Sequence, residues 1–500
     1  MDQLDLGDFP KTTKLDLISK DELITKYSML ESEYLRAIKE IYKLKYKNLT
    51  ESQLNLVMAE QLGSLRAELF GASSERYKKP EKKTPIIPSV PTPKIKKPSE
   101  RYPNIPVREV VIEMNPIPAC NSCGEEMLKT SMTEDSEQLT VIPKKYEIIL
   151  QKKVKYRCEC QSCIITAQAP ARIIPGSSYS DEMILDVVLS KYCDLIPIER
   201  YVAMAGRNGL IDLPPHSLIE LSHQFADFVR PVYSMIKKMM LESRVLHADE
   251  TPHRMLERGG GKKWFLWGFS SQNHCFLECH DTRSGDIASD ILKNSKCEIL
   301  ISDVFSGYAK AVRISNIERE KEKKPIIRNA NCNAHARRYF FKPHEEYPEA
   351  KFYLDHYHEI YRLEALAKEK SPLEVLKIRA LMLERFEAMK LQALNEQLMY
   401  PSASQYGKAL NYFLGNYVGL TLFLDEADVA IDNNQQERLL RNHVVGRKTW
   451  YGTHSKRGAE TASILFTLVE TCKLNHVNPR EYFQNLVTAM LSGKPAFTPV

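Results

Sequence analysis

Residues 244–249 read RVLHAD and residues 298–303 read EILISD, so two short apolar runs each end in an aspartate. Two further apolar or aromatic runs between them, 263–270 and 274–280, also predict strands, whereas residues 285–294 predict a helix. Three consecutive strands, a helix and a fourth strand, with helices after them, predict an α/β layered core.

Three carboxylates stand where they could form one site. Asp249 and Asp303 end apolar strands, and a carboxylate at the end of a buried strand emerges at the edge of its sheet, while Glu437 lies in the first turns of a helix capped by Asp432 or Asn433. Converging carboxylates repel unless cations neutralise them, and hard oxygen ligands select Mg²⁺ or Mn²⁺. Other acidic residues of these stretches are assigned no part in the site: Glu250, Asp281 and Asp432.

Five of the eleven cysteines fall in one short segment. CNSC at 120–123 and CECQSC at 158–163 supply two thiolate pairs, which together suit one tetrahedral structural Zn²⁺. The assigned ligands are Cys120, Cys123, Cys160 and Cys163, with Cys158 as the alternative to Cys160. Ordinary free thiols are the less favoured interpretation. A closed four-thiolate site builds structure and does not catalyse.

The N-terminal region predicts a long helix. Leu23, Leu30, Ala37 and Leu44 recur every seven residues in a segment, 20–70, that contains no proline. This pattern favours a coiled coil that self-associates over an amphipathic helix packed on its own chain.

A basic linker and a helical region follow. Residues 76–108 hold eight prolines and ten Lys or Arg, which indicates an extended segment that either contacts DNA phosphates or only separates domains. Helices at 198–207 and 215–228, joined by Asn208-Gly209, form a candidate helix-turn-helix. The predicted domains are a coiled-coil helix (20–75), the linker (76–108), a zinc-binding domain (109–175), a helical region (176–240), a catalytic core (241–475) with a helical insertion at about 345–425, and a C-terminal tail (476–500).

Composition narrows the class of protein. A hydrophobic fraction of 43% and a charged fraction of 27% in 500 residues are typical of globular chains, and a net charge of +6 is only mildly basic. No run approaches the roughly 18 apolar residues of a membrane span, and the N-terminal residues lack the pattern of a signal peptide. We therefore expect no membrane partner and a reducing cytoplasmic location.

Several motifs together resemble those of the insertion sequence 66 family of bacterial transposases, which are DDE enzymes. The matching stretches, in the family's order, are LRAELFGASSE (65–75), the cysteine segment, HADETP (247–252), DVFSGY (303–308), CNAHARRYF (332–340), DNNQQER (432–438), GRKTW (446–450) and KRGAE (456–460). They cover nearly the whole chain.

The resemblance implies a ribonuclease H-like core in which Asp249, Asp303 and Glu437 are the acidic triad. It implies two Mg²⁺ or Mn²⁺ ions that support cutting and joining of DNA, both at the element's ends and at the target, without a covalent protein intermediate. In that fold the first and fourth strands are neighbours, which would bring Asp249 beside Asp303. The expected partners are DNA, a second copy of the chain bound through the N-terminal helix, and accessory proteins of the same element. We also expect the protein to be associated with the nucleoid.

Other residues near the triad are given supporting roles. Cys332 and His335, spaced CxxH after a predicted fifth strand, are interpreted as packing or hydrogen-bonding support for the core, in preference to a second metal site. Trp450 and Tyr451 would stack on an unpaired base or belong to the core. Residues suited to phosphate contacts are Arg337, Arg338, Arg438, Arg441, Arg447, Lys448, Lys456 and Arg457.

Two other functions are less favoured. A non-catalytic DNA-binding regulator would need only the coiled coil, the zinc segment and the helix-turn-helix, so the presence of three acids in full motifs counts against it. A nuclease acting on RNA hybrids would not need the upstream segments for recognition of DNA ends.

Overall fold

The structure is a computed structural model that describes residues 97–119, 121–122, 124–129, 132–157, 159, 163–256 and 263–500. The predicted coiled coil and four of the cysteines, Cys120, Cys123, Cys158 and Cys160, lie outside these residues. The chain divides into two units, one that includes Gln151–Val500 and another formed by Ser73–Leu150.

Short elements precede the main fold. In the smaller unit, α3 (Pro98–Arg101) is a single turn of helix, and the hydroxyl of Ser99 donates to Glu137 over 2.9 Å. In the larger unit, β1 (Lys155–Arg157) and β2 (Ile164–Thr166) pair antiparallel and flank residues 158–163, the second cysteine motif. Among the described residues, every helix is too short or too polar to span a bilayer.

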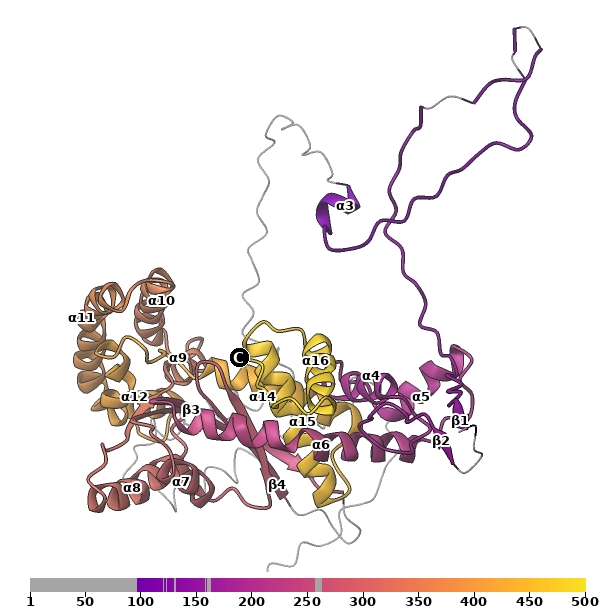
Figure 1. Ribbon diagram of the computed structural model, residues 1–500. Coiled ribbons are helices and arrows are strands. Elements are labelled where there is room, and N and C mark those ends of the chain that lie inside the picture. Colours follow the sequence, from indigo (N-terminus) through magenta and orange to yellow (C-terminus); the bar gives the residue numbers. More distant parts are fainter. Residues whose placement is uncertain are drawn as a thin grey trace, which may run out of the picture. The chain divides into compact units, whose positions relative to one another are not determined.

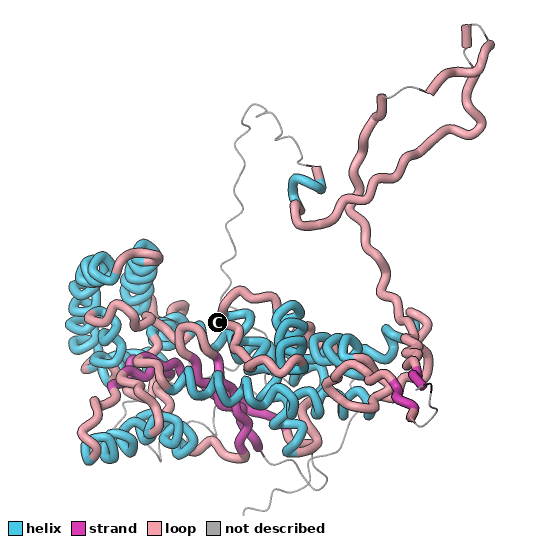
Figure 2. Tube along the Cα trace, viewed as in Figure 1, coloured by secondary structure: helices cyan, strands magenta, loops and turns pink. Residues whose placement is uncertain are grey.

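A five-stranded mixed sheet forms the centre of the larger unit (Figures 1 and 2), and its strand order is β5–β4–β3–β6–β7. In this sheet, β4 pairs antiparallel with both β3 and β5, whereas β3, β6 and β7 run parallel to one another. The first and fourth strands of the core, β3 and β6, are therefore neighbours, as predicted. The strands are β3 (Val245–Arg254), β4 (Lys263–Ser270), β5 (Cys275–His280), β6 (Ile299–Ser302) and β7 (Arg328–Asn331).

The strand β3 is longer than predicted. We expected it to end at Asp249, but it pairs with β4 as far as Arg254, through Pro252. A proline lacks the backbone N–H that a central strand needs. It is tolerated here because β3 pairs with β6 only from Val245 to His247, so that side of the strand is free at Pro252.

Helices cover both faces of the sheet. α7 (Gly285–Lys293) and α8 (Ser306–Lys321) share one apolar core with Leu300 of β6. The neighbouring residues Ile299 and Ile301 point the other way, into a second core that includes α9 (Asn333–Phe341). Because side chains alternate along a strand, β6 is apolar on both faces and its four residues are all buried.

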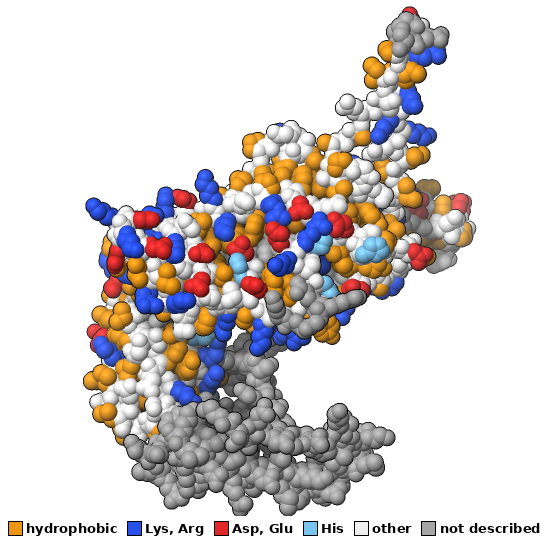
Figure 3. Space-filling view, turned by 90° about the horizontal axis from the view of Figure 1, so that it is seen from below, with side chains coloured by type: hydrophobic (Ala, Val, Ile, Leu, Met, Phe, Trp, Pro, Cys, Tyr) orange, Lys and Arg blue, Asp and Glu red, His pale blue; other side chains and the backbone are white. Residues whose placement is uncertain are grey.

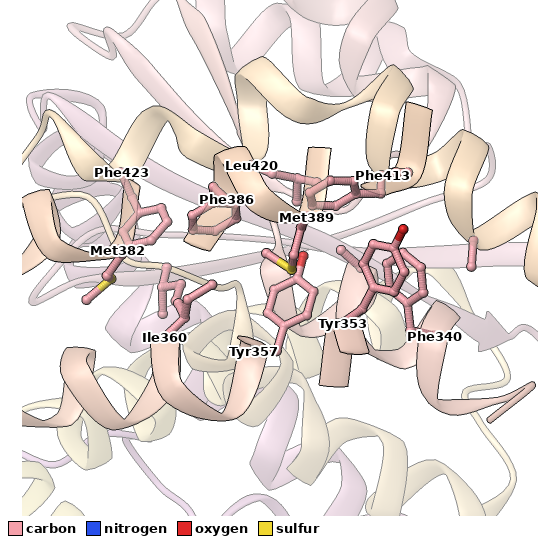
Figure 4. Packing of buried hydrophobic residues seen from close by; sticks show 14 of the residues in the cluster. Phe340, Tyr353, Tyr357, Ile360, Met382, Phe386, Met389, Phe413, Leu420 and Phe423 are labelled. Atoms are coloured by element: carbon pink, nitrogen blue, oxygen red, sulfur yellow. The ribbon is translucent and has the colours of Figure 1, made fainter. Parts of the chain in front are cut away.

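The helical insertion builds the second core. Phe340 stacks on Tyr353 with ring centroids 4.1 Å apart, and the Phe413 ring of the insertion packs edge-on against both, with centroids 6.0 and 6.2 Å away (Figure 4). The buried Arg379 guanidinium donates to Glu364 and to the carbonyl of Phe423. The insertion comprises α10 (Ala350–Ala367), α11 (Pro372–Gln397), α12 (Gln405–Gly415), α13 (Tyr417–Thr421) and the 3₁₀ turn η2 (Leu422–Leu424).

The helical region before the sheet contains α4 (Asp181–Tyr192), α5 (Ile198–Arg207) and α6 (Pro215–Leu241). The first helix of the candidate helix-turn-helix is confirmed. The second continues beyond the predicted end at Phe228, through Pro231, to Leu241. It continues because buried apolar residues keep helical spacing along it, at Val229, Val232, Ile236 and Met240.

The C-terminal residues form three helices, α14 (Asn434–Trp450), α15 (Lys456–Leu474) and α16 (Pro479–Leu491). The last lies in the segment we expected to be a tail. Asn478 caps it by accepting from the Arg480 amide, Pro479 occupies its first turn, and Phe483 on its inner face is fully buried. The tail is thus part of the folded unit.

Hydroxyl groups of α15 cover the outer edge of the sheet. The amides of Cys275, Leu277 and Cys279, which face outward from β5, donate to Thr471, Thr467 and Ser463 at 3.3, 2.9 and 3.0 Å. Four helical residues rise about 6.0 Å and two strand residues about 6.8 Å, so the two repeats nearly match. The helix therefore takes the place of a sixth strand.

Replacing one of these hydroxyls should destabilise the fold. Thr467→Val keeps the shape of the side chain but leaves the buried Leu277 amide without an acceptor, so we expect a loss of about 1–3 kcal/mol in the free energy of unfolding. Urea denaturation measures it. The matched control is Thr488→Val, an exposed hydroxyl that donates only within its own helix. Equal stability of the two variants would contradict the role of the hydroxyl ladder.

Candidate active site

Asp249 and Asp303 lie on neighbouring parallel strands. The pairing of β3 with β6 ends at His247 and Ile301, and each aspartate stands two positions beyond that pair. Both therefore lie where the parallel strands separate, at their carboxyl ends, where α/β sheets place binding sites. The carboxylate of Asp303 accepts from the Phe305 amide over 3.1 Å, which fixes the turn into α8.

The charges of four carboxylates act on one another here. Burial, together with the nearby charges of Glu250, Asp303 and Glu437, raises the pKa of Asp249 to about 8. The structure thus brings the three predicted acids, Asp249, Asp303 and Glu437, into one electrostatic cluster. Only the amide of Glu250 favours the ionised form of Asp249, by donating to Oδ1 over 2.9 Å.

Glu250, which the sequence analysis set aside, belongs to this cluster. Its side chain is 2% exposed, accepts from the Tyr308 hydroxyl and pairs with Arg283. Since successive strand residues point to opposite faces, Glu250 ties β3 to α8 on the face away from Asp249. Tyr308 ends the DVFSGY motif that begins with Asp303, so this contact holds the two aspartate-bearing segments together.

Glu437 is positioned by the start of α14. Asn433, fully buried just before the helix, donates from Nδ2 to the Ala248 carbonyl over 2.8 Å and contacts His247 Nδ1 through Oδ1 over 2.9 Å. The Asn433 amide also donates to Cys332 Sγ over 3.2 Å. These bonds join the Glu437 helix to β3 and to the start of α9. His247 is buried and takes part in this contact.

A second group of possible metal ligands includes Glu437. The ligand atoms of Cys332, His335 and Glu437 lie within 4.8 Å of one another, and within the described parts of the chain no other group of three or more Cys, His, Asp or Glu lies as close. The oxygens of Asp249, Asp303 and Glu437 are thus farther apart than this.

The predicted phosphate-binding residues have different surroundings. Arg457 pairs with Glu220 and Asp227 of α6, and its carboxylate partners raise its pKa. Arg447 is half-buried, and burial lowers its pKa. By contrast, residues exposed on α14 and at the start of α15 are Arg438, Arg441, Lys448 and Lys456, while Arg337 and Arg338 on α9 are half-buried.

Glu437, Arg441 and Lys448 lie on one side of α14, because residues four and eleven positions apart share a helix face. This positive face leads away from the carboxylates. On the side of the molecule that Figure 3 displays, basic and acidic side chains are interspersed.

The aromatic rings of Trp450 and Tyr451 have different surroundings in the structure. The Trp450 ring packs against Gly446 and lies 5.8 Å from Lys191 Nζ, which favours a structural role. Tyr451 is 66% exposed and has a positive φ of 65°, so its ring is open to a partner.

A buried histidine pair lies farther along the same helix. His253 Nδ1 and His443 Nε2 are 3.2 Å apart, and His253 Nε2 contacts the Thr453 hydroxyl over 2.8 Å. Burial lowers the pKa of His253 to about 4 and the pKa of His443 well below its usual range, and the positive charge of Arg447 adds to both shifts. Both rings are therefore neutral in the folded protein.

This pair predicts acid sensitivity. As pH falls below about 6.5, the unfolded chain binds protons at both histidines, whereas the folded chain does not bind one at His253 until pH is near 4. Stability present above about pH 6.5 is therefore lost between these values, by on the order of 3 kcal/mol from His253, and the lowered pKa of His443 adds to the loss. Urea denaturation across this range measures it. In His443→Phe the loss should be smaller than in wild type, and an equal loss would contradict the role of the pair.

Comparisons with known proteins agree with the family that the motifs resemble. The family model described as "Transposase IS66 family" matches residues 176–461. Three relatives from Sinorhizobium fredii (strain NBRC 101917 / NGR234) are similar over most of their length, and all are described as uncharacterized proteins. Protein y4hP is 25% identical, with 77% of this chain and 72% of the relative covered. Protein y4qI is 25% identical, with 74% of this chain and 70% of the relative covered. Protein y4jD is 24% identical, with 78% of each chain covered.

Proposed function

Because the chain belongs to the IS66 transposase family, we propose that it cuts and joins DNA at a site formed by Asp249, Asp303 and Glu437. The observation that carries this proposal is the shared electrostatic environment at Asp249, to which the charges of Asp303 and Glu437 both contribute. The strand order of the sheet, and the position of the two aspartates where its central parallel strands separate, support a ribonuclease H-like core.

The donor set fits divalent cations. Asp249 is largely buried and has carboxylates as its charged neighbours, so a cation would remove a repulsion that the protein itself leaves in place. Bound Mg²⁺ or Mn²⁺ at these three acids would polarise the scissile phosphodiester and activate the attacking oxygen. Side chains of the protein then need only hold ligands and DNA in position, and no Ser, Cys or Tyr nucleophile is required.

The residues around the acids have positioning roles in this proposal. Glu250 and Tyr308 fix the Asp303 turn against β3, and Asn433 fixes the start of the Glu437 helix. DNA would approach along the exposed face of α14. First water cuts a strand and frees a 3′-hydroxyl, and then that hydroxyl attacks the target at the same acids.

The test is an assay of the purified protein on the terminal DNA of its own element with Mg²⁺. We expect nicked products that carry a 3′-hydroxyl, joined products when target DNA is added, no DNA covalently attached to protein, and no reaction with a chelator present. Specific binding of the ends without any cleavage would overturn the catalytic proposal and favour the DNA-binding regulator.

The expectations for other segments are proposals too. We propose that Cys120, Cys123, Cys163 and either Cys160 or Cys158 hold a structural Zn²⁺, and the β1–β2 hairpin on both sides of the second motif supports this. Purified protein without stoichiometric zinc would contradict it.

We propose that residues 20–75 dimerise the protein, and sedimentation as a monomer at high concentration would contradict that.

Charge removal on α14 should weaken binding of DNA without changing sequence preference. For Arg441→Ala and Lys448→Ala, we expect a shallower plot of the logarithm of the DNA-binding constant against the logarithm of the salt concentration. The slope should decrease in magnitude by about 1 for each lost phosphate contact. Fluorescence anisotropy at several salt concentrations measures the slope. The control is Lys351→Ala, an exposed lysine of α10 that pairs with Asp355. An unchanged slope in both α14 variants would exclude this face as the DNA track.

A further inference from the structure

Glu437 also faces ligands of a different kind, on the side of α9. Cys332 is the residue just before α9, His335 lies in its first turn, and Glu437 lies in the first turn of α14. A thiol, an imidazole and a carboxylate therefore converge from the starts of two helices, within 4.8 Å of one another.

Two polar atoms in this group have no partner. His335 Nδ1 and Glu437 Oε1 are both buried as atoms, neither makes a hydrogen bond, and they face each other at 3.7 Å. That distance is too long for a hydrogen bond. Buried polar atoms without partners are costly and rare, so an additional group between them would explain the arrangement. Packing alone, the role predicted from sequence, does not.

The sulfur of Cys332 is already oriented as an acceptor. It is fully buried, and the amides of Asn433 and His335 both donate to it, the first over 3.2 Å. Amide hydrogen bonds of this kind stabilise the negative charge of a metal-bound thiolate and hold its direction. The geometry of the sulfur is therefore independent support for a ligand role.

We propose that Cys332, His335 and Glu437 bind one Zn²⁺, with water as the fourth ligand. In tetrahedral sites with bonds of about 2.0–2.3 Å, ligand atoms stand roughly 3.3–3.7 Å apart, which small side-chain shifts reach from the arrangement described. Thiolate and imidazole ligands select Zn²⁺ over Mg²⁺ or Mn²⁺. On binding, the Zn–S bond replaces the S–H bond, and the Cys332 proton leaves to solvent.

This site shares Glu437 with the cluster of Asp249 and Asp303. An oxygen of Glu437 bound to Zn²⁺ is withdrawn from the hard-metal ligands, so Zn²⁺ should inhibit cleavage in competition with the catalytic cations. This consequence rests on the proposed function, whereas the binding of Zn²⁺ does not.

Cobalt substitution tests the binding directly. Full-length protein, first saturated with one equivalent of Zn²⁺ for the four-thiolate site, is titrated with Co²⁺, and the thiolate-to-cobalt charge-transfer band is followed. We expect a further equivalent in wild type, in Cys193→Ser as the matched cysteine control, and in Asp249→Asn. Cys332→Ser and His335→Gln should bind Co²⁺ more than about 100-fold more weakly.

The outcomes separate the two proposals. Loss of the band in Cys332→Ser and His335→Gln, with retention in Asp249→Asn, supports the zinc site even if no variant cleaves DNA. A band that persists in both Cys332→Ser and His335→Gln, or no further equivalent in wild type, overturns it. In the cleavage assay, Zn²⁺ that inhibits His335→Gln as strongly as wild type would refute the competition for Glu437.

Discussion

Asp249→Asn should abolish Mg²⁺-dependent cleavage and at the same time stabilise the metal-free protein. The loss of activity should exceed the roughly 10–100-fold that removal of an outer partner of a metal ligand costs, because a ligand itself is removed. The gain in stability follows from the buried position of Asp249 among Glu250, Asp303 and Glu437, whose charges oppose its ionisation. The amide keeps the shape and removes the charge.

The gain should depend on pH. The pKa of Asp249 is raised to about 8 in the folded chain. In the unfolded chain it is about 3.9, so the folded state binds the extra proton between these values and stability falls as pH rises, with the full loss above about pH 8. Asn removes this dependence. We therefore expect Asp249→Asn to be more stable than wild type by on the order of 5 kcal/mol above about pH 8, and little changed near pH 4.

Thermal melts at several pH values, with and without Mg²⁺, measure the gain in stability and the binding of Mg²⁺. Mg²⁺ should raise the melting temperature of wild type, since it binds the folded state, and should do so much less in the variant. The control is Asp281→Asn, an exposed carboxylate just after β5, which should change neither stability nor cleavage. Wild-type cleavage by Asp249→Asn would remove this residue from the site, and a lower melting temperature at alkaline pH would contradict the electrostatic argument.

Asn433→Ala should have the second largest effect. It leaves the Ala248 carbonyl and His247 Nδ1 buried without their partner, at a cost of about 2–4 kcal/mol. Since Asn433 Nδ2 donates to the carbonyl, Oδ1 must accept from His247, so both bonds are specific to an amide. The start of the Glu437 helix should shift as well, and a displacement of about 1 Å at a catalytic group can reduce the rate about 100-fold.

Urea denaturation and cleavage at saturating Mg²⁺ separate the two consequences of Asn433→Ala. A folded variant that still cleaves slowly would indicate misplacement of Glu437 and not simple unfolding. The matched control is Asn434→Ala, whose side chain bonds only to the neighbouring Asp432 and should matter little. A wild-type unfolding midpoint for Asn433→Ala would show that these hydrogen bonds do not hold the helix.

Most strands of the sheet could be predicted because they are short apolar runs, whereas the neighbouring of β3 and β6 was implied by the resemblance to the family. The placement of the acids followed from the same runs: Asp303 directly follows β6, and Asp249 stands two positions beyond the part of β3 that pairs with β6. The length of β3 could not be predicted in this way. A proline such as Pro252 is normally absent from a strand with partners on both sides. Only the tertiary arrangement leaves one side of β3 without a strand partner at this position.

The supporting residues could not be read from sequence because their roles depend on distant partners. Glu250 is adjacent to Asp249 but points to the opposite face, and its importance comes from Tyr308, 58 positions away. Asn433 looked like one of two possible helix caps, yet its side chain bonds to β3 and not to its own helix. Pairing of polar groups across a fold leaves no periodic pattern in the sequence.

The hydroxyl ladder of α15 has a consequence for assembly. At the opposite edge, α13 lies so close to β7 that a Cβ on Gly419 would stand 2.4 Å from Asn331 Nδ2. Both margins of the sheet are thus occupied within the chain itself, which prevents a foreign strand from extending it and protects against edge-to-edge polymerisation. Two copies of the chain therefore cannot pair through the edges of this sheet, and their sheets stay separate.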